Sequence, residues 1–476
     1  MEGRYKAYPE YKDSGVEWLG DVPQHWRIVP LKHLATLTPK KSGIDKQKMS
    51  ESCSFVPMDK LKLNSLQLDE TRLISDVYDG YTYFENEDVL VAKVTPCFEN
   101  KNMAVAKNLV NGIGFGSSEI YVLRTNTKFN NQFLFYRLQE DGFMEIATAA
   151  MSGAGGLKRV PAEVINTFLA AIPSYEEQQK IANFLDHETA KIDTLIAKQE
   201  KLIELLKEKR QAVISHAVTK GLNPDAPMKD SGVEWLGEVP EHWDVARLKH
   251  LIKSLESGCS VNAADIPAKE NEIGVLKTSC VYTRRFRAGE NKTVVIEDLS
   301  RVKCPVRKGA IIISRMNTPD LVGASALVET EAKNLFLPDR LWQTIFNEEF
   351  EVNPEFLAYF MTVEGFRNQI SLSAEGASSS MQNIAKEDYL AINALLPQLR
   401  EQVEIVSCIK EKEAKFLLLE EQAMSAIELM KERRTALISA AVTGKIDVRD
   451  WQESIQAIPQ RRMQKQPQKP PQGVQG

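Results

Sequence analysis

The chain has 476 residues, of which 43% are hydrophobic and 26% are charged, and its 65 acidic residues outnumber its 60 lysines and arginines. This length predicts about two to four domains, because one hydrophobic core rarely serves more than ~250–300 residues. A formal charge of −5 excludes a histone-like protein that holds nucleic acid by bulk positive charge. No apolar run could span a bilayer, and the first residues lack the apolar stretch of a signal peptide, so we expect a cytoplasmic protein without membrane contact.

The six cysteines are scattered and have no Cys-x-x-Cys spacing or neighbouring histidine. They therefore predict neither a disulfide framework nor a zinc site, and we interpret them as buried or incidental thiols. They are Cys53, Cys97, Cys259, Cys280, Cys304 and Cys408.

The first recognisable element is a block from Lys12 to Trp26 that returns from Lys229 to Trp243, 217 residues later, with two Asp/Gln-to-Glu changes. A later block, Glu208 to Thr219, returns from Glu432 to Thr443. A repeat of roughly 220 residues is a whole domain with its connector, far above the solenoid period of ~20–50 residues.

Two dissimilar interiors, residues 31–171 and 248–395, lie between these repeated blocks. Their patterns predict mixed α and β structure. We expect strands at 88–92, 119–123 and 310–313, and helices at 133–138 and 356–361. Similar frames around dissimilar interiors are expected if the frames make common contacts and the interiors bind different things; neutral drift after an old duplication is the alternative.

Two long helices follow the interiors. Residues 176–218 contain neither glycine nor proline, carry apolar side chains at three- and four-residue steps, and end at Gly221 and Pro224. Residues 400–442 repeat the pattern and end at Gly444. Each helix would be about 60 Å long. We expect them to pack antiparallel about a pseudo-twofold axis, because their apolar stripes are too long for one small domain to cover; local packing on each domain is the alternative.

The predicted fold class is therefore α+β, with two similar mixed α/β domains separated by two long antiparallel helices in a coiled-coil-like spacer. After Asp450 the chain turns to glutamine, proline and basic residues, which predicts a disordered tail. The expected segments are 1–30, 31–171, 172–247, 248–395, 396–449 and 450–476.

Familiar catalytic motifs are missing from the sequence. It has no phosphate-binding loop, zinc-protease helix, nucleophile elbow or Asn/Asp-Pro-Pro-Tyr/Phe methyltransferase signature. One loose pattern, Asp320 with Glu331 and Lys333, could hold Mg²⁺ and orient water. A stand-alone Mg-dependent DNA-cleaving or modifying enzyme therefore stays open as an alternative, as does a coiled-coil scaffold that binds no DNA.

Basic residues are concentrated inside the interiors. Residues 284–315 contain nine lysines and arginines against three acids, as phosphate contacts require, although a solvated strand face would look the same. Two glycine-rich stretches, before Leu157 and from Gly376, align with each other. Lysine and arginine at one tip suit guanine, and glutamine and asparagine at the other suit adenine, unless both are plain surface turns. The DNA-binding candidates are Lys40, Lys41, Lys93, Lys158, Arg159, Arg284, Arg285, Arg287, Arg315, Gln382 and Asn383.

The repeated segments resemble the conserved regions of type I restriction-modification specificity subunits. The resemblance rests on the blocks that begin at Lys12 and Lys229, on Ile172-Pro173 with Glu177-Gln178 and their counterparts Leu396-Pro397 with Glu401-Gln402, and on Ile214 to Gly221. It covers nearly the whole chain to about residue 450; the Gln/Pro-rich tail lies outside it.

The resemblance implies two target-recognition domains, each of which reads one half of a bipartite double-stranded DNA site. It also implies a helical spacer that docks methyltransferase subunits, two of them expected, and restriction subunits that join this core. It implies no catalytic residue, metal or cofactor in this chain; S-adenosylmethionine, ATP and Mg²⁺ would belong to the partner subunits.

Overall fold

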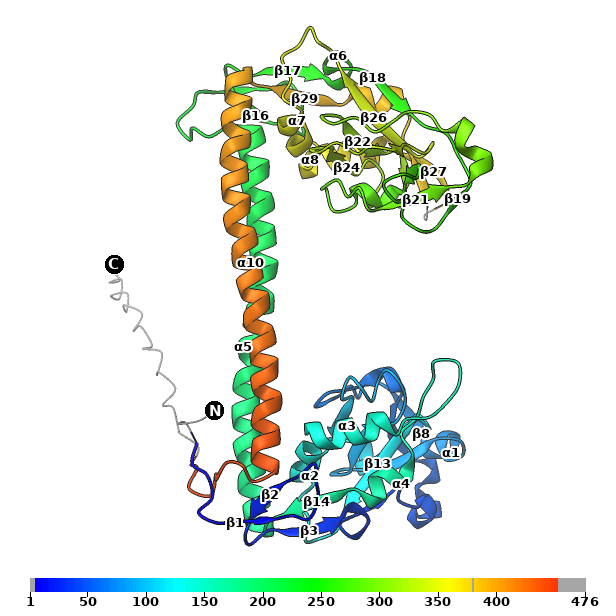
Figure 1. Ribbon diagram of the computed structural model, residues 1–476, viewed down its shortest axis with the longest axis vertical. Helices are drawn as coiled ribbons and strands as arrows, with labels where there is room; N and C mark the ends of the chain where they lie inside the picture. Colours follow the sequence, from blue (N-terminus) through cyan, green and yellow to red (C-terminus); the bar gives the residue numbers. More distant parts are fainter. Residues whose placement is uncertain (1–4, 379–380, 453–476) are drawn as a thin grey trace, which may run out of the picture. The chain divides into compact units, whose positions relative to one another are not determined.

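The computed structural model describes residues 5–378 and 381–452, and divides the chain into two compact units. The first contains the chain up to Lys198 and again from Ala426, and the second runs from Gln199 to Ser425 (Figure 1). Residues 453–476 of the predicted tail, and Ser379 and Ser380 in the second glycine-rich stretch, lie outside the described residues. Trp451 packs edge-on against Phe184, with ring centroids 5.6 Å apart.

The first unit contains two four-stranded sheets. One is antiparallel throughout and has the order β11 (Met103–Val105), β10 (Val89–Ala92), β13 (Ile120–Thr125) and β4 (Ala35–Leu37). The other has the order β8 (Thr71–Leu73), β5 (Ser52–Val56), β12 (Ile113–Gly116) and β9 (Thr82–Glu85), and its strands β5 and β12 are parallel. Paired beside them are β1 (Tyr11–Asp13) with β2 (Asp21–Pro23), β3 (Arg27–Pro30) with β14 (Leu169–Ile172), and β6 (Leu61–Lys62) with β7 (Ser65–Leu66). The short helices are α1 (Ile74–Val77), α2 (Asn131–Arg137), α3 (Asp141–Ala149) and α4 (Ala162–Thr167).

The second unit repeats this plan with one sheet altered. Its first sheet is again antiparallel and has the order β18 (Ile252–Ser257), β26 (Leu341–Phe346), β22 (Ile311–Ser314) and β24 (Ser325–Leu327). Its second sheet has the order β19 (Ala263–Ala264), β21 (Asn291–Val294), β20 (Gly274–Leu276) and β25 (Leu335–Phe336). The remaining strands are β15 (Met228–Asp230) with β16 (Glu238–Pro240), β17 (Asp244–Arg247) with β29 (Asn393–Leu396), and the three-stranded sheet β23 (Met316–Asn317), β28 (Met381–Asn383) and β27 (Glu375–Ser378). The helices are α6 (Leu248–Leu251), α7 (Pro354–Phe360), α8 (Glu364–Ser373) and α9 (Lys386–Ala391).

The predicted strands and short helices are confirmed. The strands expected at 88–92, 119–123 and 310–313 are β10, β13 and β22, and the expected helices are α2 and α7. The first sheet of each unit has the same order and direction, whereas the second has one parallel pair in each but differs in its outer strands. The common architecture therefore lies in the frame and the first sheet, and the divergence is concentrated in the second sheet and its loops.

The two long helices are α5 (Tyr175–Lys220) and α10 (Leu399–Val442), within a residue or two of the predicted bounds. In the first unit the beginning of α5 shares a core with the end of α10, for example through Ile181 and Leu437. In the second unit the end of α5 shares a core with the beginning of α10, for example through Ile214 and Ile405. The helices therefore pack antiparallel, as the sequence predicted, and the fold class is α+β with an internal repeat.

The apolar stripe is not completely buried by this pairing. In the second unit several apolar side chains of both helices are about half exposed, because two helices bury only a narrow seam between them. They are Leu202, Leu205, Leu418, Leu419 and Met424.

In each unit, the repeated block that ends in Trp26 or Trp243 contacts the first turn of a long helix. In the first unit Trp26 donates its indole N–H to Glu177 at 3.1 Å, and in the second Trp243 does the same to Glu401 at 3.1 Å. The residue after each glutamate is a glutamine that bonds to the two segments packed against it. Its side chain accepts from the backbone N–H of the α2 or α7 N-cap and donates to the carbonyl of the proline before the helix. These residues recur in both copies because they join each domain to its helix.

Candidate nucleic-acid interface

The two glycine-rich stretches form topologically equivalent hairpins beside the first sheet of each unit. In the first hairpin, Arg159 pairs in antiparallel bridges with Val94 on one side and with Ser152 on the other. In the second, Asn383 pairs in the same way with Met316 and Glu375. The register therefore equates Arg159 with Asn383, Lys158 with Gln382, and Lys93 with Arg315.

Each hairpin requires glycine at one position. A Cβ atom on Gly153 would lie 2.2 Å from the carbonyl oxygen of Leu157, and one on Gly376 would lie 2.3 Å from that of Met381. Real Cβ atoms do not approach backbone oxygens this closely, so any other residue would force the two sides of the hairpin apart. The glycines thus bring the tip residues against the strand that carries Lys93 or Arg315.

In the first hairpin the charged side chains form a partly neutralised group. Arg159 holds Glu119 side-on, with Nε and Nη2 each 2.9 Å from a carboxylate oxygen, and this bond lowers the pKa of Glu119. Lys93 lies over the ring of Tyr121 at 5.2 Å from its centroid, and the Tyr121 hydroxyl donates to the carbonyl of Val160. Lys158 is exposed, and its ammonium group has no bonded partner among the described residues.

In the second hairpin the same positions carry no acid. The backbone N–H of Lys93 donates to the carbonyl of Glu119 at 3.0 Å, and that of Arg315 donates to Arg340 at 3.1 Å, so Arg340 stands where the first unit has Glu119. Buried side-chain atoms here have no hydrogen-bond partner within the described part of the chain: Arg315 Nε, Gln382 Oε1 and Asn383 Oδ1. Unpartnered buried polar atoms are uncommon in folded proteins, which makes this hairpin the place to look for a ligand.

The other sequence candidates lie elsewhere. Lys40 is exposed before a short 3₁₀ turn, and Lys41 donates to the carbonyl of Tyr78. Arg285 lies 3.8 Å from Glu413, and Arg287 lies 3.5 Å from Glu290. The basic run at 284–315 is therefore not one continuous free surface, because acids that are distant or nearby in sequence pair with several of its cations. Further pairs in this run are Lys292 with Asp265, Arg301 with Asp298, and Arg307 with Glu256.

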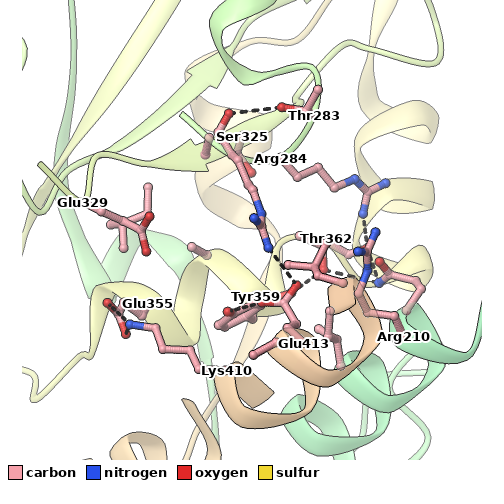
Figure 2. A pocket seen from close by; sticks show the side chains of 18 residues that line it. Arg210, Thr283, Arg284, Ser325, Glu329, Glu355, Tyr359, Thr362, Lys410 and Glu413 are labelled. Atoms are coloured by element: carbon pink, nitrogen blue, oxygen red, sulfur yellow. Dashed lines mark hydrogen bonds and ion pairs between the residues drawn. The ribbon is translucent and has the colours of Figure 1, made fainter. Parts of the chain in front are cut away.

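A cleft of about 370 Å³ lies where the second domain meets the helices of its own unit (Figure 2). Arg284 lines it and donates to the carbonyl of Thr362 at 2.7 Å. Tyr359 of α7 donates its hydroxyl to Glu413 of α10 at 2.7 Å, and burial followed by this bond raises the pKa of Tyr359. Lys410 of α10 lies 2.6 Å from Glu355 of α7, so a second contact joins the same two helices. The polar contacts that line this cleft attach the second domain to α10.

The first unit has an equivalent cleft of about 640 Å³ with its charges reversed. Tyr136 of α2 donates its hydroxyl to Asp186 of α5 at 2.7 Å, and burial raises the pKa of Asp186. In the repeat, Asp186 stands where the second unit has Lys410, and Lys107 stands where it has Glu329. The tyrosine is common to both clefts, whereas the charged residues around it differ.

No group of three or more histidine, cysteine, aspartate or glutamate side chains placed to hold a metal occurs among the described residues. Asp320 and Glu331 therefore do not belong to such a group, and the carbonyl of Asp320 accepts a bond from the guanidinium of Arg367. All six cysteines are free, and no helix in the described ranges is long and apolar enough to cross a membrane.

Sequence reasoning missed Glu119 and Arg340. Each reaches its hairpin through residues more than 20 positions away in sequence, Glu119 through Lys93 and Arg159, and Arg340 through Arg315, so no local pattern could reveal either. The shared tyrosines, Tyr136 and Tyr359, could have been found, since they occupy the same position in the aligned repeats.

Comparison with known proteins places these features in one family. A family model described as the type I restriction modification DNA specificity domain matches residues 23–205. The chain is 24% identical to the type I restriction enzyme EcoEI specificity subunit of Escherichia coli, over 91% of this chain and 85% of that protein. It is also 24% identical to the EcoKI specificity subunit of Escherichia coli strain K12, over 90% of each.

The fold is also similar to that of a solved chain. A chain from a structure of complex assembly and conformational transition in a type I R-M system matches with a TM-score of 0.68 at 16% identity, covering 89% of this chain and 99% of that chain. The likeness in sequence and in fold covers both repeats and both long helices. The chain is therefore similar, over nearly its whole length, to the DNA specificity subunits of type I restriction-modification systems, and residues 23–205 match the DNA specificity domain of that family.

Proposed function

We propose that this chain determines the DNA sequence specificity of a type I restriction-modification complex, and that each recognition domain reads one half of a bipartite, asymmetric DNA site. The observation that carries the proposal is the pair of hairpins. They share one backbone register, yet their equivalent side chains differ: Lys158 and Arg159 in the first, Gln382 and Asn383 in the second. Two rigid frames that present different hydrogen-bonding groups are what an asymmetric site requires.

The hairpins also supply the charge that DNA binding needs. Lys93, Lys158 and Arg159 outnumber Glu119 in the first, and Arg315 and Arg340 outnumber Glu375 in the second. Such local clusters attract phosphates although the chain as a whole is acidic, because each neutralised phosphate releases counterions. The candidates away from the hairpins, including Lys40, would contribute backbone contacts rather than base reading.

The two long helices would set the distance between the half-sites and dock the methyltransferase subunits. The half-exposed apolar side chains on both helices of the second unit favour this role, since apolar groups such as Leu202, Leu418 and Met424 gain by being covered. We expect two methyltransferase subunits, one for each repeat, and restriction subunits bound to that core.

In this proposal the chain contributes recognition and assembly, and its partners contribute chemistry. S-adenosylmethionine, ATP and Mg²⁺ would be bound by the methyltransferase and restriction subunits, in the cytoplasm where the DNA lies. We assign recognition to residues 31–171 and 248–395, and the spacer and docking surfaces to 172–247 and 396–449, with the segment 1–30 completing the frame.

The test is co-expression of the full chain with its adenine methyltransferase subunit, followed by mapping of methylated adenines in the host DNA. We expect a split motif with a fixed gap, and the loss of one half of that motif when the corresponding recognition domain is replaced. The matched control is the methyltransferase subunit alone. Purified complex that methylates no split motif would refute the proposal, and salt-insensitive partner binding without duplex binding would favour the scaffold alternative.

A further inference from the structure

We infer that positions 159 and 383 are equivalent base-reading positions, where Arg159, supported by Glu119, reads a guanine in one half-site and Asn383 reads an adenine in the other. This inference rests on the proposed function and assigns specificity to individual side chains within it. It concerns position and chemistry together, because the same backbone site presents a guanidinium in one domain and an amide in the other.

The backbone at both positions is held from two sides. Arg159 is bridged to Val94 and to Ser152, and Asn383 to Met316 and to Glu375. Paired backbone on both sides restricts the direction in which a side chain leaves the hairpin. Such restriction is what base discrimination requires, since a reader that can shift by 1 Å accepts the wrong base.

The Arg159 side chain is prepared for one particular contact. Its pair with Glu119 uses one N–H on Nε and one on Nη2, each 2.9 Å from a carboxylate oxygen. A guanidinium has five N–H donors, so the end formed by Nη1 and the second Nη2 hydrogen stays free. That end carries two parallel donors that match O6 and N7 of guanine in the major groove. The side chain is 45% exposed, so DNA can reach it.

Glu119 is a positioning residue in this arrangement. A free arginine loses side-chain entropy when it binds, and the Glu119 pair has restricted the guanidinium before DNA arrives. An exposed ion pair by itself adds little to the free energy of unfolding. If the pair of Arg159 and Glu119 were only structural, replacing either residue would therefore change neither the stability nor the recognised motif by much.

The second hairpin presents the complementary chemistry. Arg340 replaces Glu119, so no acid is there to orient an arginine, and position 383 carries an amide instead. An amide offers one donor and one acceptor, the pair that matches N7 and N6 of adenine. Asn383 Oδ1 and Gln382 Oε1 are buried without a hydrogen-bond partner among the described residues. Rotation of these amides toward a base would remove that deficit.

The two groups carry similar net charge. The first has three cations and one carboxylate, which amount to +2, and the second has the two cations Arg315 and Arg340 and the carboxylate of Glu375, which amount to +1. Both hairpins should therefore attract phosphate. The larger difference lies in the donor and acceptor pattern, which is the part of an interface that reads sequence.

The experiment uses the full chain co-expressed with its methyltransferase subunit and reads the motif from methylated host DNA. Arg159→Ala should relax one guanine in one half-site, with a loss of about 5- to 150-fold in discrimination at that position and no change in the other half-site or the gap. Asn383→Ala should relax one adenine in the other half-site by a similar factor.

The matched control is Arg72→Ala. Arg72 is another exposed arginine of the same domain, and its Nε and Nη2 bond to one carboxylate oxygen of Glu70 at 2.9 and 2.7 Å, but it lies on β8 of the second sheet, whereas the hairpin is bridged to Val94. Its replacement should leave the motif unchanged. If Arg72→Ala and Arg159→Ala relax the motif alike, the assignment to the hairpin is overturned.

An exchange variant keeps the inference falsifiable if Arg159→Ala abolishes methylation. Glu119→Arg combined with Arg159→Asn installs the second hairpin's pair in the first, and should convert the guanine at that position to adenine. A wild-type split motif that none of these variants alters at a single position overturns the inference and leaves the proposed function intact. Absence of a split motif for the wild-type complex overturns the proposed function itself.

Discussion

The bond network around Glu177 allows a quantitative test of how the repeated frame holds each domain. Glu177 accepts from the Tyr8 hydroxyl at 2.7 Å and from the Trp26 indole at 3.1 Å, and both donors are buried. Glu177→Ala leaves two buried donors without an acceptor, at about 1–3 kcal/mol each, so we expect a loss of about 2–6 kcal/mol in the local opening free energy.

Glu401 provides the internal control, because it lacks the Tyr8 contact. It accepts from the buried Trp243 indole at 3.1 Å and from the half-exposed His242. Glu401→Ala leaves one buried donor unpaired, so the expected loss is about 1–3 kcal/mol.

Amide hydrogen exchange followed by mass spectrometry measures both losses locally, which matters because two units need not unfold together. We expect amides of β2 and β3 to exchange at least about 30-fold faster in Glu177→Ala, and amides of β16 and β17 at least about 5-fold faster in Glu401→Ala. Tyr8→Phe should show how much of the difference is due to the hydroxyl. Equal acceleration in the two glutamate variants would refute the reasoning that unpaired buried donors set the cost.

Three further predictions concern burial, pH and length. Burial raises the pKa of the Cys53 thiol to about 11 and that of Cys280 to about 12, so both should resist iodoacetamide at pH 8.5 in the native protein while the half-buried Cys97 reacts; peptide mass spectrometry reads the modification. Burial and then the bond to Glu177 raise the pKa of Tyr8 above its ordinary value of 10. Folding thus disfavours the ionised form of Tyr8, so its contribution to the free energy of unfolding is fully present below pH 10 and is lost as the pH rises above 10. In urea titrations, the free energy of unfolding of Tyr8→Phe should fall less steeply above pH 10 than that of the wild type. Removing seven residues from each long helix should shorten the methylation gap by about 10 Å, or about three base pairs, and an unchanged gap would contradict the spacer role.

The two clefts illustrate how repeated sequence and divergent sequence divide their roles. The cleft tyrosines, Tyr136 and Tyr359, each donate a hydroxyl to an acid on the long helix of their own unit. The two acids are not at equivalent positions, because Asp186 stands where the second unit has Lys410. A duplicated tyrosine can therefore keep its role while the charged residues around it change, because a hydroxyl donates equally well to an aspartate at one position and to a glutamate at another.

Much of the fold was determined by the sequence alone. The helices at 175–220 and 399–442 and the strands β10, β13 and β22 follow from local periodicity and from the residues that end an element. Periodicity is a property of neighbouring residues, so one chain is enough to reveal it. The near-identical blocks also identified the residues that join each domain to its helix, because the same contacts must be made twice.

The proposed reading surface, in contrast, was decided by tertiary structure. Arg159 meets Glu119, and Arg315 bonds to Arg340, only because separate segments come together in a particular register, which no local pattern specifies. The basic run at 284–315 was predicted as a cluster suited to phosphate contacts, yet its cations pair with different acids, including Glu413 on a helix distant in sequence. Charge counted along a sequence gives the number of cations, whereas the number left free for phosphate depends on which acids the fold brings within about 4 Å of them.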